Sequence, residues 1–259
     1  MSELIIKPKS DDMGKNIFYI LLFLLSLSTI QMLYGTLSQI IIHNFKLQGN
    51  NYIIENYWSM TIYFILAKVL VISVYSILLF LTLKQVNWKF SSIGFDVDNL
   101  TEDIKLGFKT FLVFPVLPFV VYFLFSNIIG TFNVEKFLKP SIDLSLQQSF
   151  LSFFLILLTS VLIFPIFEEI LFRGVLFKKL LYISRPLTAI LISSLIFSLF
   201  HIDLFKLDSF YLPNLMPIFI GGIALGFLRW KTGNLWSSIL FHILWNGFTY
   251  STYYWSIIR

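Results

Sequence analysis

Two adjacent carboxylates and an arginine interrupt an apolar part of the sequence, in the stretch Phe-Glu-Glu-Ile-Leu-Phe-Arg at residues 167–173. Glu169 and Arg173 are four residues apart, so on a helix they share one face and can form an ion pair. Glu168 points about 100° away from Glu169, because a helix completes one turn every 3.6 residues. The spacing therefore predicts that the arginine anchors Glu169 while Glu168 faces a cavity, where a carboxylate can act as a general base.

The position of this motif along the chain favours a functional interpretation. The apolar run before it could cross a bilayer, and the apolar pattern resumes after it as far as Phe177. The first cations that can mark a membrane surface are Lys178 and Lys179. Ten helical residues separate Glu168 from Lys178, or about 15 Å, which places Glu168 near mid-depth in a core about 30 Å thick. The plainer alternative is that the span ends at Ile166 and the carboxylates lie at the interface.

Two of the three histidines can reach a similar depth. His201 ends the fifth predicted apolar span, in the stretch Phe197-Ser198-Leu199-Phe200-His201, and His242 precedes Asn246 by four residues on one helix face. Counted from the inner ends of their helices, these side chains lie about 12–22 Å into the membrane. Imidazole and carboxamide groups can hold water or stabilise an oxyanion beside a general base. The third histidine, His43, is interpreted as an interfacial residue.

The composition defines the class of protein that must position these groups. Of the 259 residues, 57% are hydrophobic and 13% are charged, with a mean hydropathy of +0.82, whereas soluble domains carry about 25% charged residues. We expect an all-α polytopic transmembrane helix bundle with a polar catalytic cavity in the membrane. About seven spans are predicted, with an eighth or a re-entrant segment as the alternative. They run roughly over 16–42, 57–83, 106–129, 149–171, 186–201, 214–229 and 235–257.

The basic residues predict the orientation of the chain. With the N-terminus inside, 12 of the 19 Lys and Arg residues fall on inner segments and 5 on outer ones, which favours a cytoplasmic N-terminus. Residues 1–15 are then a cytoplasmic tail, and residues 16–259 form one transmembrane domain. The net charge of +5 is explained by this topology, so membrane lipid is the expected partner and nucleic acid is not. The abundance of Ile, Phe, Lys and Asn indicates a bacterial plasma membrane.

The sequence also predicts how some helices pack and excludes the chemistry that depends on cysteine. Gly222 and Gly226 form a GxxxG pattern, which predicts close helix packing. The linker at residues 90–100 is expected to lie along the inner interface. The chain contains no cysteine, which excludes disulfides, a thiolate nucleophile and cysteine-ligated metals.

Three motifs, in this order, resemble those of the CAAX-protease and bacteriocin-processing (Abi, CPBP) intramembrane proteases. They are Glu168-Glu169-x-x-x-Arg173, Phe197-x-x-x-His201 and His242-x-x-x-Asn246. The similarity covers about residues 149–250, and no motif position departs from the family pattern. The resemblance implies an intramembrane endopeptidase whose substrate is a membrane-associated or lipidated protein or peptide. Its biological setting would be peptide or bacteriocin processing, or self-immunity.

The resemblance also implies a role for each residue. Glu168 is expected to activate water, and His201 to hold that water or to bind a metal. His242 and Asn246 are expected to stabilise the oxyanion or to position the scissile carbonyl. The supporting residues, which would orient the site, are Glu169 and Arg173.

The sequence leaves alternatives for the metal and for the class of function. Zinc could be held by Glu168, His201 and His242, with one position left for water. The same residues could also work without a metal. The lack of a helical His-Glu-x-x-His arrangement favours this metal-free alternative. No cofactor is firmly implied. The alternatives to an endopeptidase are an ion-coupled transporter, since intramembrane acids and histidines also relay protons, and a non-catalytic membrane scaffold or immunity protein. The pattern predicts neither the substrate's identity nor an oligomeric state.

Overall fold

The computed structural model describes residues 19–26, 69–77, 79–81, 91–128, 157–201 and 211–257, together with residues 17, 66, 84 and 154. Within these residues the secondary structure is helical and contains no strand, which confirms the all-α fold. The elements are η1 (Ser91–Ile93), α4 (Leu100–Val113), α5 (Val116–Ile128), η3 (Leu158–Ile163), α8 (Phe164–Glu169), η4 (Ile170–Leu176), α9 (Phe177–Ile183), α10 (Pro186–Leu199), α11 (Tyr211–Thr232) and α12 (Trp236–Ile257). The predicted N-terminal tail and most of the first two predicted spans lie outside the described residues.

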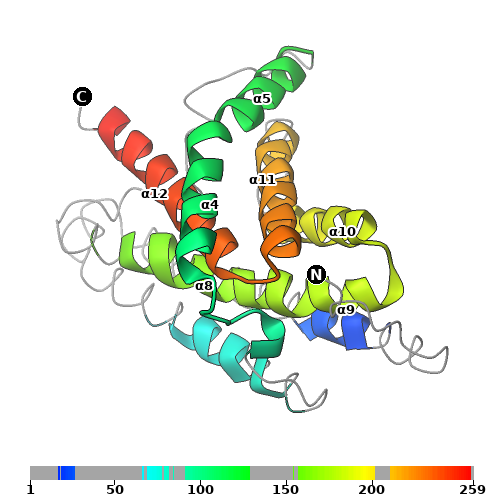
Figure 1. Ribbon diagram of the computed structural model, residues 1–259. Coiled ribbons are helices and arrows are strands. Elements are labelled where there is room, and N and C mark those ends of the chain that lie inside the picture. Colours follow the sequence, from blue (N-terminus) through cyan, green and yellow to red (C-terminus); the bar gives the residue numbers. More distant parts are fainter. Residues whose placement is uncertain are drawn as a thin grey trace, which may run out of the picture.

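One long helix, made of η3, α8, η4 and α9, carries the two adjacent carboxylates. The residues at its internal junctions, such as Ile163 and Glu169, keep right-handed helical backbone angles, so the helix continues through them. Both η3 and η4 are π-helical, a wider winding that is frequent at functional sites. The helix ends at Ser184, where the backbone becomes extended (φ −143°, ψ 170°), and Pro186 begins α10. In Figure 1 this helix lies across the lower ends of α4, α11 and α12.

The helix therefore extends well past residue 171, where the sequence places the end of the fourth span. Lys178 and Lys179, which the sequence suggests as surface markers, are half-buried and buried respectively. Lys179 thus packs inside the protein and Lys178 lies partly at its surface, and their use as markers of the membrane surface stays a prediction. The other helices begin and end close to their predicted positions, as the start of α10 at Pro186 shows.

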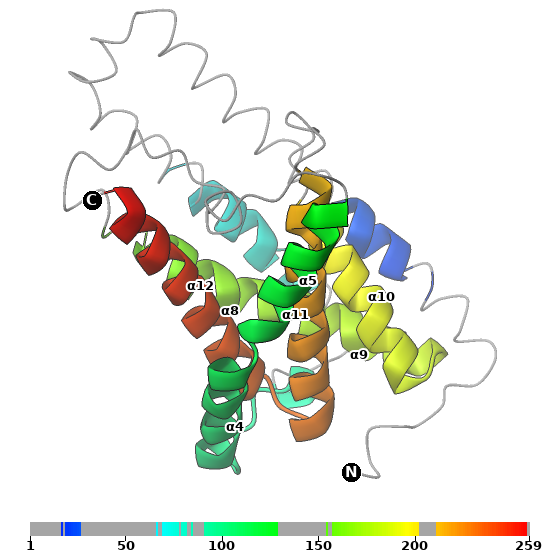
Figure 2. The ribbon, with the colours of Figure 1, turned by 90° about the horizontal axis from the view of Figure 1, so that it is seen from above.

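The helix α11 is the centre of the bundle, and both α5 and α10 pack on it (Figure 2). Its contact with α10 depends on small residues. A Cβ at Gly222 would lie 3.0 Å from the Cβ of Ser194, and one at Gly226 would lie 3.2 Å from a methyl carbon of Ile190. The GxxxG pattern thus permits the close helix packing that it predicts.

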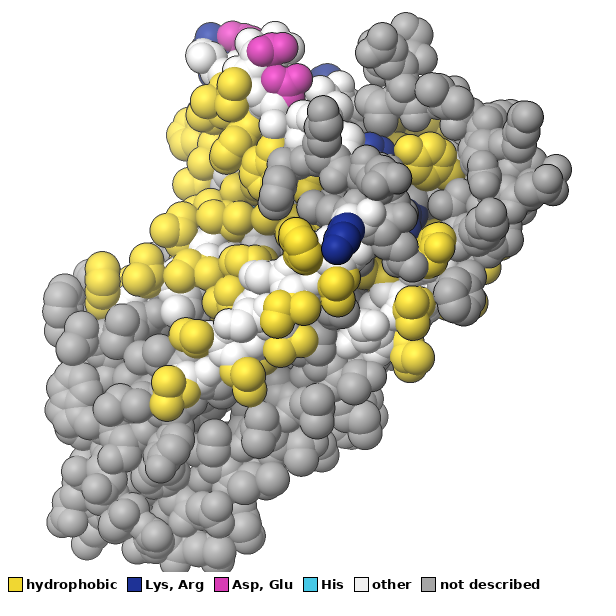
Figure 3. All heavy atoms as spheres, turned by 90° about the horizontal axis from the view of Figure 1, so that it is seen from below, with side chains coloured by type: hydrophobic (Ala, Val, Ile, Leu, Met, Phe, Trp, Pro, Cys, Tyr) yellow, Lys and Arg dark blue, Asp and Glu magenta, His cyan; other side chains and the backbone are white. Residues whose placement is uncertain are grey.

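Among the described residues, one helix is long and apolar enough to cross a membrane, as judged from length and composition. It consists of α4 and α5 together, Leu100–Ile128, and many of its apolar side chains are exposed. A shorter apolar helix covers Pro186–Leu199. Figure 3 shows hydrophobic side chains across one face of the molecule, with Asp and Glu gathered at one end. The prediction of about seven spans is not confirmed by the described part of the chain.

The segment before α4 is fixed to the turn between α11 and α12. The backbone N–H of Leu235 donates to the carbonyl of Gly94 over 2.8 Å, and the indole N–H of Trp236 donates to the carbonyl of Asp96 over 2.9 Å. Gly94 has a φ of +102°, which glycine adopts without the steric cost of a side chain. These bonds connect the predicted linker at residues 90–100 to the start of α12, the helix that carries His242 and Asn246.

Neighbouring glycines allow a matched test of the packing between α10 and α11. We expect Gly222→Ala to lower the free energy of unfolding by about 1–3 kcal/mol, because its methyl group presses on Ser194. A Cβ at Gly221 would meet no atom of another described segment within 4 Å, so Gly221→Ala is expected to be neutral or stabilising by about 0.5–1 kcal/mol. Thermal denaturation in one detergent compares the two variants. Equal effects would contradict the close contact.

Candidate active site

Glu169 and Arg173 form a completely buried ion pair, as their four-residue spacing predicts. Nη1 of Arg173 lies 3.0 Å from Oε1 of Glu169, and both side chains are 0% exposed. Nη2 of Arg173 donates to the carbonyl oxygen of Gly222 in α11 over 3.3 Å. The guanidinium carbon lies 4.2 Å from the centre of the Phe197 ring in α10, close enough for a cation–π contact. Arg173 therefore connects the long helix to both α10 and α11.

His242 connects the two glutamates. Its Nδ1 lies 3.0 Å from Oε1 of Glu169, and its Nε2 lies 3.5 Å from Oε2 of Glu168. Since Oε1 of Glu169 also accepts from Arg173, the imidazole Nδ1 is the donor in the shorter contact. The ring is thereby oriented with Nε2 directed at Glu168.

The two glutamates differ in how far their side chains are exposed. The Glu168 side chain is 22% exposed, whereas the Glu169 side chain is 0% exposed. The His242 side chain between them is 6% exposed. The two consecutive glutamates thus have different surroundings, as the rotation of 100° between successive helical residues predicts. Glu168 is the carboxylate of this pair that water can reach.

Asn246 follows His242 by one helical turn on α12 and contacts the π-helical segment η3. Its Nδ2 donates to the carbonyl oxygen of Ser160 over 3.1 Å. A carboxamide carries two N–H donors, so this bond orients the group and uses one of them.

His201 belongs to the same cluster through Phe197. Nδ1 of His201 lies 2.8 Å from the carbonyl oxygen of Phe197. A carbonyl only accepts hydrogen bonds, so Nδ1 carries the proton and the neutral ring presents Nε2 as an acceptor. The Phe197 ring centre lies 4.6 Å from that of His201 and 5.7 Å from that of His242. One aromatic ring therefore contacts both imidazoles as well as Arg173.

The choice between zinc and a metal-free mechanism concerns Glu168, His201 and His242. The described residues include no group of three or more His, Cys, Asp or Glu side chains placed to hold a metal ion. Whether these three residues bind a metal stays a prediction.

Lys178 and Lys179 hold the long helix in place at α9, which follows both the site and the predicted span. The Lys178 ammonium donates to the carbonyl oxygen of Ser92, and the Lys179 ammonium lies 5.1 Å from the centre of the Tyr19 ring. Burial, and after it the charge of Arg229, lowers the pKa of Lys178 to about 8. Burial also lowers the pKa of Lys179 to about 8. Both lysines thus fix α9 to the segments around it, and their burial removes part of their hydration.

Several contributors to this site are not assigned from the sequence. The sequence motif includes Phe197, but it does not show that the Phe197 ring contacts Arg173 and both imidazoles. The GxxxG pattern marks Gly222 as a packing residue, but it does not show that the Gly222 carbonyl oxygen accepts from Arg173. No pattern in the sequence indicates that the Ser160 carbonyl accepts from Asn246. Tyr75 packs against the apolar core and lies within electrostatic range of Glu168, but a tyrosine in an apolar span gives no signal of this.

The cluster brings one partly exposed carboxylate together with imidazole and carboxamide groups. Residues 150–248, which include all six predicted site residues, match the family model described as type II CAAX prenyl endopeptidase Rce1-like. This part of the chain is similar to the CAAX protease (CPBP) family, which is the family that its three motifs resemble. Members of the family are integral membrane proteins and proteases. A comparison with curated proteins and with solved structures gives no match.

The two glutamates are expected to differ in their effect on stability. Glu169→Gln leaves the Arg173 charge buried without its carboxylate, so we expect the free energy of unfolding to fall by about 3–5 kcal/mol. Glu168→Gln changes a partly exposed group without an arginine partner, so a change below about 1 kcal/mol is expected. Denaturation of both variants in one detergent measures the difference. A loss in Glu168→Gln as large as that in Glu169→Gln would contradict the asymmetry.

Proposed function

We propose that this chain is an intramembrane endopeptidase in which Glu168 activates the water that hydrolyses the peptide bond. The observation that carries this proposal is the placement of Glu168, 22% exposed and 3.5 Å from the His242 imidazole. A general base must be accessible to water and within hydrogen-bond or single-water reach of its partners. Glu168 meets this requirement, whereas Glu169 is 0% exposed and engaged by Arg173.

In this mechanism Glu168 takes a proton from water as the water oxygen attacks the scissile carbonyl carbon. Protonated Glu168 then delivers the proton to the leaving amine nitrogen, so the carboxylate is regenerated when the C–N bond breaks. His201 holds the water, which its Nε2 can do as an acceptor. These steps use side chains of the chain alone and involve no metal.

His242 and Asn246 are proposed to stabilise the negative charge that develops on the carbonyl oxygen. Asn246 offers the N–H that Ser160 does not use, and His242 offers Nε2–H when both ring nitrogens carry protons. Donors that are held in place before the reaction are worth about 3–4 kcal/mol each in comparable sites. Glu169 and Arg173 act as positioning residues, because they fix the imidazole through Nδ1.

The substrate is proposed to be a membrane-associated or lipidated protein or peptide. The matching family model is described as a prenyl endopeptidase, which supports a substrate with a lipidated C-terminus. A leader peptide, in bacteriocin processing or self-immunity, belongs to the same chemical class of substrate. We place the enzyme in a bacterial plasma membrane as a multi-pass protein with a cytoplasmic N-terminus.

The proposal predicts that Glu168→Gln abolishes cleavage while the protein stays folded and membrane-inserted. We expect a loss of at least about 100-fold, the lower end of general acid–base contributions. Membrane peptides from cells that express the intact protein or the variant are compared by mass spectrometry. Glu102→Gln, an exposed glutamate in α4, is the matched control and is expected to leave the products unchanged.

Unchanged products in Glu168→Gln would reject Glu168 as the base. The same comparison with a metal chelator added to isolated membranes is expected to show undiminished cleavage. Loss of cleavage with the chelator, and its recovery with zinc, would reject the metal-free mechanism.

A further inference from the structure

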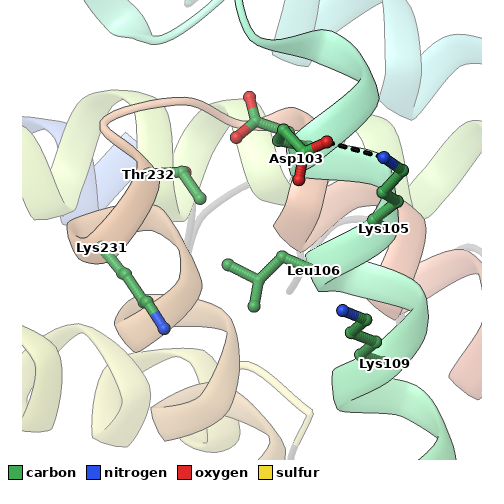
Figure 4. A pocket seen from close by; sticks show the side chains of 7 residues that line it. Asp103, Lys105, Leu106, Lys109, Lys231 and Thr232 are labelled. Carbon is green, nitrogen blue, oxygen red and sulfur yellow. Dashed lines mark hydrogen bonds and ion pairs between the residues drawn. The ribbon is translucent and has the colours of Figure 1, made fainter.

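A second polar feature of the molecule is a pocket of about 270 Å³ between the beginning of α4 and the end of α11 (Figure 4). It is lined by Glu102, Asp103, Lys105, Leu106, Lys109, Lys231 and Thr232. None of these residues is a predicted site residue of the peptidase. The pocket therefore needs an explanation of its own.

Two lysines of this pocket form no ion pair with a carboxylate among the described residues, although the Lys109 charge lies within electrostatic range of Glu102. Lys105 is paired with Glu102, with 2.7 Å between Nζ and Oε1, and Asp103 is only 4% exposed. Lys109 and Lys231 are exposed and approach the same space from opposite helices (Figure 4). No ion pair within the described part of the chain involves either of them. Two ammonium groups that face one space attract an anion.

The hydroxyl group of Thr232 is not available to such an anion. Its Oγ1 contacts the carbonyl oxygens of Leu228 and Asn234, each over 3.0 Å, and it accepts from the backbone N–H of Asn234 over 3.1 Å. The hydroxyl therefore stabilises the turn after α11, and the lysines provide the affinity for a ligand.

The surroundings of the pocket are those of a membrane interface. Beyond Lys109, α4 exposes apolar side chains, with Leu112 at 62% and Val113 at 77%. Beside Lys231, α11 exposes Phe227 and Trp230, whose ring centres are 5.8 Å apart. Aromatic side chains gather where a membrane protein meets the headgroups. The pocket thus lies where the charged end of the membrane-crossing helix meets its apolar part.

We propose that this pocket binds the phosphate group of an anionic membrane lipid, with Lys109 and Lys231 as its ligands. Basic pockets between transmembrane helices bind such headgroups. The acyl chains would lie along the exposed apolar residues of α4. A free phosphate ion has the same charged oxygens, but it gains nothing from those apolar residues, so the two sources can be separated by experiment.

The test uses the full-length protein in vesicles of phosphatidylcholine with about one third phosphatidylglycerol. Lipid that remains with the protein after mild extraction is counted by native mass spectrometry. We expect phosphatidylglycerol to be enriched over phosphatidylcholine on the unsubstituted protein. The double variant Lys109→Gln/Lys231→Gln is expected to lower this preference about 30-fold, since each basic residue near an anionic surface contributes a factor of about five.

A matched control removes the same charge elsewhere. Lys84→Gln/Arg185→Gln replaces two exposed cations outside the pocket and is expected to keep the preference. A wild-type protein without phosphatidylglycerol enrichment would overturn the proposal, whatever the variants do. An equal loss in both double variants would overturn it as well, because the effect would then follow net charge.

Inorganic phosphate distinguishes the lipid from the free ion. The unsubstituted protein in pure phosphatidylcholine is titrated with phosphate, and its thermal denaturation is followed. We expect no shift that depends on Lys109 and Lys231. A phosphate-dependent shift that Lys109→Gln/Lys231→Gln abolishes, without phosphatidylglycerol enrichment, would identify a free-phosphate site and overturn the assignment to lipid.

Discussion

The buried ion pair between Glu169 and Arg173 is the constraint on which the rest of the site depends. Removing two charges from water costs several kcal/mol per ion, and their attraction offsets this only with good geometry and further hydrogen bonds. Arg173 obtains these from the Gly222 carbonyl and the Phe197 ring, and Glu169 from His242. Each contact comes from a different helix, so the pair is satisfied only when α10, α11 and α12 are all in place.

Because it depends on three helices, the Glu169–Arg173 pair contributes more to orienting the site than to the stability of the fold. Oε2 of Glu169 and Nε of Arg173 have no hydrogen-bond partner among the described residues, so the pair is not fully compensated. A buried pair of this kind is weak evidence for stability, and its best-supported role is to specify one arrangement. Here that arrangement fixes the His242 ring and presents Nε2 to Glu168. The more accessible glutamate can then act on water while its neighbour remains in the core.

Short-range geometry was predictable from the sequence, and contacts between distant segments were not. The Glu169–Arg173 pair and the different surroundings of Glu168 follow from helical periodicity, and the close packing at Gly222 follows from the GxxxG pattern. The contact between Glu169 and His242 joins residues 73 positions apart, and depends on how α12 crosses the long helix. The motifs indicated that Glu168, Glu169 and His242 act together. Spacing alone does not predict which imidazole nitrogen contacts which carboxylate.

Other differences arise from structure that periodicity does not encode. The π-helical turns on both sides of α8 alter the winding that an ideal helix wheel assumes. Lys178 and Lys179 are expected from the sequence to be exposed at a membrane boundary, yet Lys179 is buried and Lys178 is half-buried against neighbouring segments. The pocket at Lys109 and Lys231 joins residues that lie more than a hundred positions apart, and so becomes visible only when α4 and α11 are placed side by side.

The orientation of the His242 ring is the central claim, and nitrogen-15 NMR of histidine-labelled protein in lipid tests it most directly. His242 signals are assigned by their loss in His242→Asn. The account predicts a protonated Nδ1 whose signal shifts in Glu169→Gln, and an Nε2 whose signal shifts in Glu168→Gln. An unprotonated Nδ1, or an Nε2 that does not respond to Glu168→Gln, would contradict it.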